Sequence, residues 1–140
     1  MKQLQHLSYS SCTSQLGEIR KDVRAASEAQ GFNESDINLI VLAVDEAYAN
    51  VIRYGYNMCD DGSMDLKIFD DGDEIVFHLA DRCPKICDAD ITAKPREADK
   101  PGGLGLHIIN DVMDGGVQLL ETDEPGNTLE LRKRKPVAPL

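Results

Sequence analysis

Polar side chains stand inside the most apolar segment of the chain, residues 37–52. Glu46 and Asn50 are four residues apart, so both lie on one face if this segment is a helix. A carboxylate and an amide oxygen that project together suit a hydrated Mg2+, which prefers hard oxygen ligands and keeps several waters. Such a carboxylate can also orient or deprotonate an attacking hydroxyl. The alternative is that both residues simply face solvent on the polar side of the helix.

A glycine cluster lies further along the chain. Gly102, Gly103 and Gly105 lead into a segment of helical periodicity that carries Leu106. Free backbone N–H groups and the positive dipole end at a helix start favour phosphate. The cluster is not a P-loop, because no Gly-Lys-Ser/Thr occurs, and the dinucleotide pattern G-x-G-x-x-G fails at Ile108. Together with the carboxylate and amide upstream, it indicates a phosphate-binding turn.

Two further positions suit recognition of a nucleotide base. Asp81 closes a predicted strand, where its carboxylate can accept from the exocyclic amine of adenine or simply start a turn. Thr128 opens the last strand and either joins Asp81 on the base through water or is merely a β-former. The stretch 88–100 is charged and is interrupted by Pro95. It is typical of a mobile loop that closes over a ligand.

Hydrophobic periodicity predicts the elements that must position these residues. Ser14 and Ser35 are expected to cap two helices, which Gly31 and Gly55 end. The predicted order is a strand within 4–9, helices from 14 to about 30 and from 35 to 55, a hairpin over 64–79, a loop, a helix from 106 and a hairpin over 116–132. Hairpins with helices interposed predict an α+β two-layer sandwich with helices on one face of a mostly antiparallel sheet. We treat residues 1–140 as a single domain.

Composition excludes several classes of function. With 15 basic and 25 acidic residues in 140, the net charge is −10, which argues against a direct nucleic-acid partner. The basic cluster 132–135 is interpreted as a solubilising end. There is no stretch apolar enough for a membrane span or a signal peptide, so we expect a cytoplasmic protein with reduced thiols. Cys83 and Cys87 form a C-x3-C pair without a second pair nearby, a weak zinc signal.

The ordered segments resemble the ATP-binding domain shared by gyrases, sensor histidine kinases and bacterial anti-sigma-factor serine/threonine kinases. The likeness is closest to the last group and covers nearly the whole chain. The ordered set is more specific than any one motif. The matching motifs are Val44-Asp45-Glu46-Ala47-Tyr48-Ala49-Asn50 with Tyr54-Gly55-Tyr56 (the N box), Asp81-Arg82-Cys83-Pro84 (G1), Gly102-Gly103-Leu104-Gly105-Leu106 (G2) and Gly126-Asn127-Thr128-Leu129 (the closing strand).

This resemblance implies the Bergerat nucleotide-binding fold and assigns roles to residues. Asn50 would bind Mg2+, Glu46 would be the catalytic base, and Asp81 and Thr128 would read adenine. The loop 88–100 would be the ATP lid. The nucleotide-contacting set that the resemblance implies is Asn50, Asp81, Cys83, Arg96, Lys100, Gly102, Gly103, Leu104, Gly105, Leu106 and Thr128, with Arg96 or Lys100 reaching the γ-phosphate.

The resemblance also implies a function. Members of this family use Mg-ATP to phosphorylate a serine on a small antagonist protein, and in the alternative complex they hold a sigma factor away from RNA polymerase. They usually work as homodimers. Two departures bear on the expectation: Cys83 replaces the usual G1 glycine, which is expected to weaken nucleotide binding rather than abolish it, and Tyr54 replaces a common histidine.

Two other functions stay open at this point. One is a nucleotide-sensing, partner-switching module without phosphotransfer, for which the departure at Cys83 is the reason. The other is an interaction domain that binds no nucleotide. Binding of ATP separates this last class from the other two, and transfer of phosphate to an antagonist separates the kinase from the sensing module.

Overall fold

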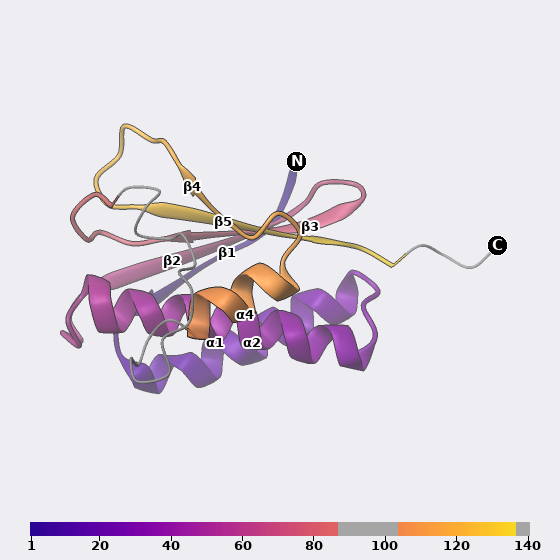
Figure 1. The fold of residues 1–140 in the computed structure, drawn as a ribbon, viewed down its shortest axis with the longest axis horizontal. Coiled ribbons are helices and arrows are strands. Elements are labelled where there is room, and N and C mark those ends of the chain that lie inside the picture. The colour runs from indigo at the N-terminus through magenta and orange to yellow at the C-terminus, as the bar shows by residue number, and fades with distance from the viewer. Residues whose placement is uncertain (87–103, 137–140) are drawn as a thin grey trace.

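The computed structural model describes residues 1–86 and 104–136. Five antiparallel strands form one sheet in the order β1-β2-β3-β5-β4, and the described α-helices cover one of its faces (Figure 1). The predicted α+β two-layer sandwich is therefore confirmed. The elements in chain order are β1 (Lys2–Ser10), the 3-10 turn η1 (Thr13–Gln15), α1 (Leu16–Ala29), α2 (Glu34–Asn50), the π-helical turn η2 (Val51–Gly55), β2 (Ser63–Asp70), β3 (Glu74–Ala80), α4 (Leu104–Val112), β4 (Val117–Leu120) and β5 (Thr128–Arg134).

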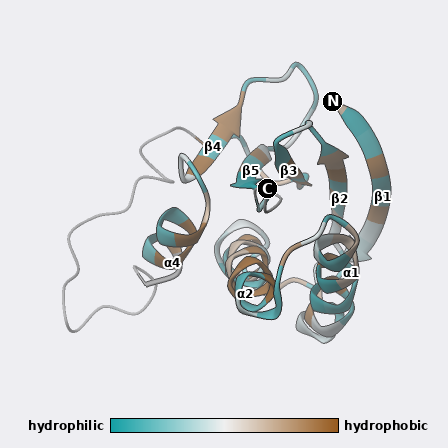
Figure 2. Ribbon diagram, turned by 90° about the vertical axis from the view of Figure 1, so that its right-hand side faces the viewer, coloured by the Kyte–Doolittle hydropathy of each residue, from teal (hydrophilic) through white to brown (hydrophobic). Residues whose placement is uncertain are grey.

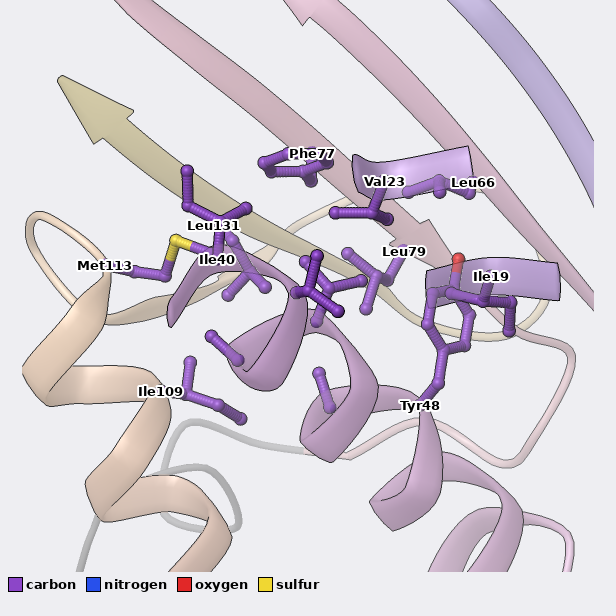
Figure 3. Packing of buried hydrophobic residues seen from close by; sticks show 14 of the residues in the cluster. Ile19, Val23, Ile40, Tyr48, Leu66, Phe77, Leu79, Ile109, Met113 and Leu131 are labelled. Carbon is purple, nitrogen blue, oxygen red and sulfur yellow. The ribbon is translucent and has the colours of Figure 1, made fainter. Parts of the chain in front are cut away.

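Helix α2 lies in the middle of the helical layer, with α1 on one side and α4 on the other (Figure 2). Its apolar side chains recur at three- and four-residue steps, and most of them are buried. On the sheet, alternate residues of each strand point to the same face, so the inward ones meet the helices. Figure 3 shows Ile40 of α2 among Phe77, Leu131, Ile109 and Met113. Each large apolar side chain buried in this way contributes about 1.5–3 kcal/mol relative to exposure.

The predicted helix caps at Ser14 and Ser35 are wrong. Asn33 caps α2, because its backbone is extended and its Oδ1 accepts from the N–H of Asp36 at 2.8 Å. Ser35 is already the second helical residue. Helix α1 begins only after η1, and the Ser14 hydroxyl donates to Cys12 Sγ instead of capping. Both errors arise because a cap depends on backbone geometry and not only on residue type.

The C-terminal end of the second helix changes its winding before it stops. The α-helix ends at Asn50, and the chain continues as one π-helical turn to Gly55, the predicted stop. The Tyr56 N–H caps this π-helical turn by donating to Val51 O at 2.9 Å. Asn57 follows with a positive φ of 51°. Single π turns are frequent at functional sites, because the extra residue changes which side chains face a neighbour.

The first part of the basic cluster belongs to strand β5 and is not a free solubilising end. Arg132 donates to Glu130 at 2.7 Å and to Asp71 at 2.8 Å. Lys135 donates to Asp70 at 2.6 Å. The Arg132–Asp71 and Lys135–Asp70 pairs join the end of β5 to the β2–β3 turn. Among the described helices, none is long and apolar enough to cross a bilayer.

Candidate functional site

A pocket of about 550 Å3 lies between the C-terminal end of α2, the N-terminal half of α4, the segment after β3 and the ends of β4 and β5. This size falls in the range of small-molecule sites in proteins. Its walls are mostly apolar, with a few polar groups among them. Its described lining residues are Ala47, Asn50, Val51, Tyr54, Gly55, Asn57, Asp81, Cys83, Pro84, Lys85, Ile86, Leu106, Ile109, Val117, Asn127 and Leu129.

The structure brings four of the sequence-predicted residues to this pocket: Asn50, Asp81, Cys83 and Leu106. They come from α2, from the segment after β3 and from α4, which are far apart in sequence. Apolar walls with a few convergent polar groups are typical of a ligand site. Asn127 and Leu129 of the closing-strand motif also line it, so the described pocket joins all four segments on which the nucleotide prediction depends.

Other predicted residues lie elsewhere. Glu46 is half-buried one turn before Asn50 on α2, and Thr128 pairs with Ala80 at the start of β5. Neither is among the described residues that line the pocket. Leu104 and Gly105 are the first two residues of α4. Outside the described residues lie the predicted lid 88–100, with Arg96 and Lys100, and the glycines Gly102 and Gly103.

Asp81 presents one carboxylate oxygen to the protein and leaves the other available. Only 9% of the residue is exposed. Its Oδ1 accepts from the backbone N–H of Cys83 at 2.9 Å, from the backbone N–H of Asn127 at 3.3 Å and from Asn127 Nδ2 at 3.1 Å. The backbone and amide N–H donors of the described residues all meet on Oδ1, and none of them reaches Oδ2. An acceptor in a mostly apolar pocket is suited to a ligand that carries an N–H donor, such as an exocyclic amine.

Asn127 is a central residue of this site that the sequence analysis missed. The residue is 3% exposed. Besides contacting Asp81, its side chain holds the segment that follows Asp81: Nδ2 donates to Pro84 O at 3.0 Å, and Oδ1 accepts from the Ile86 N–H at 2.9 Å. In the sequence, Asn127 stands in the closing-strand motif beside Gly126, but the role in base recognition was assigned to Thr128 and none to Asn127. The missing signal was the pairing of β3 with β5, which places Asn127 opposite Asp81 by extending the register from Ala80 and Thr128.

Cys83 is a buried thiol in the pocket wall, 6% exposed. Burial, reinforced by the neighbouring Asp81 carboxylate, raises the pKa of its thiol to about 11, so the sulfur is neutral at pH 7. A Cβ atom on Gly55 would lie 2.7 Å from Cys83 Sγ. The η2 turn therefore packs directly against the residue that departs from the family pattern.

The hydroxyl of Tyr56 braces the start of the Cys83 segment. It accepts from the Arg82 N–H at 2.9 Å, and it also donates to Ser63 O. Burial of the ring raises the pKa of Tyr56, so the phenol stays neutral and keeps its donor. This bond joins the loop after η2 to the segment after β3. The two walls of the pocket that carry Gly55 and Cys83 are thus fixed relative to one another.

The donor set fits a metal carried by a ligand better than a metal held by the protein alone. Among the described residues, no group of three or more His, Cys, Asp or Glu side chains is placed to hold an ion. Asn50 supplies an amide oxygen in the pocket. Mg2+ is commonly bound by one or two protein groups together with substrate phosphates and waters. The described thiols Cys12, Cys59 and Cys83 are free, and Cys87 lies outside the described residues.

Comparison with known proteins agrees with this arrangement. The family model of the histidine kinase-like ATPase domain matches residues 9–133, which include all the described residues that line the pocket. A curated relative, the serine-protein kinase RsbW of Halalkalibacterium halodurans, is 30% identical over 106 residues. That alignment covers 71% of this chain and 65% of the relative, so the chain spans slightly less than two thirds of the relative's length.

Proposed function

Because the chain belongs to the histidine kinase-like ATPase family, we propose that it is an ATP-binding anti-sigma regulatory factor with protein serine/threonine kinase activity. The observation that carries the proposal is the convergence of Asn50 and Asp81 on one pocket. One offers a metal-ligating amide oxygen and the other an acceptor suited to adenine. The relative named a serine-protein kinase supports the choice of a protein substrate.

In this proposal, the nucleotide base lies beside Asp81. The exocyclic amine of adenine donates to Asp81 Oδ2, the oxygen that the described N–H donors leave aside in favour of Oδ1. Apolar side chains such as Ile109 and Leu129 exclude water from the base and strengthen that hydrogen bond. Thr128, at the start of β5, joins the base through water. The affinity for adenine then depends on a single fixed acceptor.

The phosphates in this proposal extend toward Asn50 and the glycine turn before α4. Bound Mg2+ supplies neutralisation of phosphate charge, with the Asn50 amide oxygen as its protein ligand. The backbone of Gly102, Gly103 and Gly105 lines the phosphate chain, and Arg96 or Lys100 reaches the γ-phosphate. These roles in the lid and the glycine turn follow from the family resemblance.

Glu46 acts as the base in the proposed transfer. It stands one turn before Asn50 on α2, so the two side chains share one face of the helix. As the serine oxygen forms its bond to the γ-phosphorus, the hydroxyl proton passes to the Glu46 carboxylate, the bond to the β–γ bridging oxygen breaks, and ADP leaves. The serine belongs to a small antagonist protein.

The proposed partners are that antagonist and a sigma factor, which exchange according to nucleotide state and phosphorylation. The protein works in the cytoplasm as a homodimer and makes no direct contact with nucleic acid or membrane. The net charge of −10 supports the absence of nucleic-acid binding, because a negative surface repels a phosphate backbone.

The kinase proposal is tested by transfer of phosphate from ATP labelled at the γ position. The substrate is a protein captured from source cells on the immobilised chain. Glu46→Ala is expected to lower transfer by about 100-fold or more while nucleotide affinity is largely kept. Asp45→Ala is the matched control, because the neighbouring carboxylate binds Arg20 at 2.9 Å and has no assigned role in transfer. Normal transfer by Glu46→Ala would show that the base is assigned to the wrong residue.

One observation favours a second candidate function, a nucleotide sensor without phosphotransfer. Cys83 brings a side chain into the pocket wall at a position where the family usually has glycine. In that case ATP binds and changes partner affinity, yet no captured protein becomes labelled. Transfer that appears only in Cys83→Gly would assign the loss to this residue, whereas transfer by the unmodified protein excludes the second candidate.

A further inference from the structure

We propose that Asn127 is a positioning residue that holds the Asp81 carboxylate in the orientation that selects adenine over guanine. The inference rests on the proposed nucleotide-binding function, and it assigns a role to a residue outside the predicted site. Asn127 lines the pocket and is almost completely buried. Its side chain contacts the base-reading carboxylate and the wall beside it.

The three hydrogen bonds of the Asn127 side-chain amide are compatible with only one of its two flip states. Nδ2 donates to two acceptors, Asp81 Oδ1 at 3.1 Å and Pro84 O at 3.0 Å, and Oδ1 accepts from the Ile86 N–H at 2.9 Å. A flipped amide would set its oxygen against two acceptors and its NH2 group against a donor. The partners therefore fix which atom is nitrogen. Only a side chain with both a donor and an acceptor satisfies this site.

The consequence for Asp81 is a carboxylate that cannot rotate freely. Three donors meet on Oδ1, two of them from Asn127, so turning the group would break several hydrogen bonds at once. Oδ2 is left as a fixed acceptor. Adenine presents an amine at the position where guanine presents a carbonyl oxygen, so a fixed acceptor favours the first and repels the second. Asn127 thus contributes to base selection without itself contacting the base edge.

The backbone explains how Asn127 comes so close. The Asp81 N–H donates to Asn127 O at 2.9 Å, which extends the β3–β5 ladder by one residue. Gly126, with φ of +89°, allows the chain to approach the Asp81 carbonyl at this point. The hydrogen bonds between Asn127 and Asp81 therefore join the residue after β3 to the residue before β5.

Asn127→Asp distinguishes a positioning role from a purely structural one, because only a positioning role predicts nucleotide binding that depends on pH. The change replaces the donor Nδ2 with a carboxylate oxygen at nearly constant shape. Two carboxylates then face each other, and their repulsion raises the pKa at which the pair takes up one proton. Below that pKa the shared proton replaces the lost donor, and above it Asp81 is pushed out of place. Binding of adenine nucleotide should therefore weaken as the pH rises.

The groups around Asp81 do not create this pH dependence in the unchanged protein. The pKa of Cys83 is raised to about 11, and burial raises the pKa values of Tyr56 and Tyr48, so all three stay neutral from pH 5.5 to 8. Lys85 and Tyr54 also line the pocket. These two residues and the ionising nucleotide phosphates act equally in the unchanged protein. The pH dependence of Kd measured for the unchanged protein is therefore the baseline for the variants.

The experiment measures Kd for ADP and for GDP by calorimetry from pH 5.5 to 8. In Asn127→Asp, ADP should bind about tenfold or more weakly at pH 8 and should regain most of its affinity at pH 5.5. Asn127→Ala should lower the ratio of GDP to ADP Kd values about tenfold at every pH. Asn110→Asp is the matched control, because it makes the same change outside the pocket, at a residue whose Oδ1 accepts from the Val117 N–H.

The outcomes separate this inference from the proposed function. If the unchanged protein binds neither nucleotide, the proposed function fails. If it binds ADP and folded Asn127 variants keep both the base preference and a flat pH profile, the positioning role is refuted. Should Asn127→Asp fail to fold, the base preference of Asn127→Ala decides, because a merely structural defect would weaken ADP and GDP equally.

Discussion

Gly126 lies so close to Asp81 that no side chain fits between them: an ideal Cβ atom on Gly126 would be 1.8 Å from the Asp81 carbonyl oxygen. The obstacle is backbone, which cannot turn aside as a flexible side chain can. The φ of +89° at Gly126 adds a second requirement for glycine. The approach of β5 to the end of β3 depends on this residue, and so do the hydrogen bonds between Asn127 and Asp81.

Gly126→Ala should therefore destabilise the fold strongly. We expect a loss of about 3 kcal/mol or more in the free energy of unfolding, from left-handed strain together with the backbone clash. Gly72→Ala is the matched control, because Gly72 also has a positive φ of 72° but no atom within 4 Å of its ideal Cβ. That control should lose only about 1–2 kcal/mol. Urea unfolding measures both, and equal losses would show that the close approach is absent.

Asp81→Asn should weaken adenine nucleotide binding about 10- to 100-fold, because an NH2 group replaces one of the two acceptor oxygens and the charge is lost. Asp71→Asn makes the same change at the β2–β3 turn, where the carboxylate binds Arg132 at 2.8 Å. This control should bind nucleotide normally. Calorimetric titration with ADP gives both affinities. Unchanged affinity in Asp81→Asn would remove Asp81 from base recognition.

The thiol of Cys83 should react slowly in the folded protein. Its pKa of about 11, against an ordinary value of 9.0, reduces the thiolate fraction at pH 8 about 100-fold. Alkylation by iodoacetamide should therefore be at least about 100-fold slower in the native protein than in urea, and should accelerate as the pH approaches 11. Peptide mass spectrometry follows the modification of Cys83 directly. Equal rates in the native and unfolded states would contradict the burial of this thiol.

Glu130 should contribute to stability at neutral pH and lose that contribution in acid. Burial acts to raise its pKa, but hydrogen bonds from Arg132 and His78 outweigh this effect, so the pKa lies below its ordinary value. A carboxyl with a lowered pKa stabilises the fold above its unfolded-state pKa, and this contribution is lost as the pH falls through the folded-state pKa. Glu130→Gln should cost about 1–3 kcal/mol at pH 7 and less near pH 3. Urea unfolding at the two pH values measures the difference, and a cost independent of pH would contradict it.

The sequence predicted the fold well because its periodicities are strong. Alternation in Met64, Leu66 and Ile68 indicates a strand with one buried face, and all three side chains are buried. Helical spacing likewise identified α2 and α4. The helix caps were wrong, because Asn33 and Ser35 are both suitable residue types and only the backbone decides between them.

The structure places only some of the residues predicted for the nucleotide site in the wall of the pocket. Asn50, Asp81, Cys83 and Leu106 do so among the described residues, whereas Glu46 and Thr128 do not. Asn127 was missed because its role depends on the pairing of β3 with β5 across some 46 residues. No local pattern of hydrophobicity reports such a contact. Long-range strand order is the information that the sequence alone did not supply.

The most direct test of the whole account is a titration of the unchanged protein with ATP in the presence and absence of Mg2+. We expect saturable binding of ATP that Mg2+ strengthens, that ADP displaces and that GTP does not match. The absence of any binding at millimolar ATP, in either condition, would contradict it.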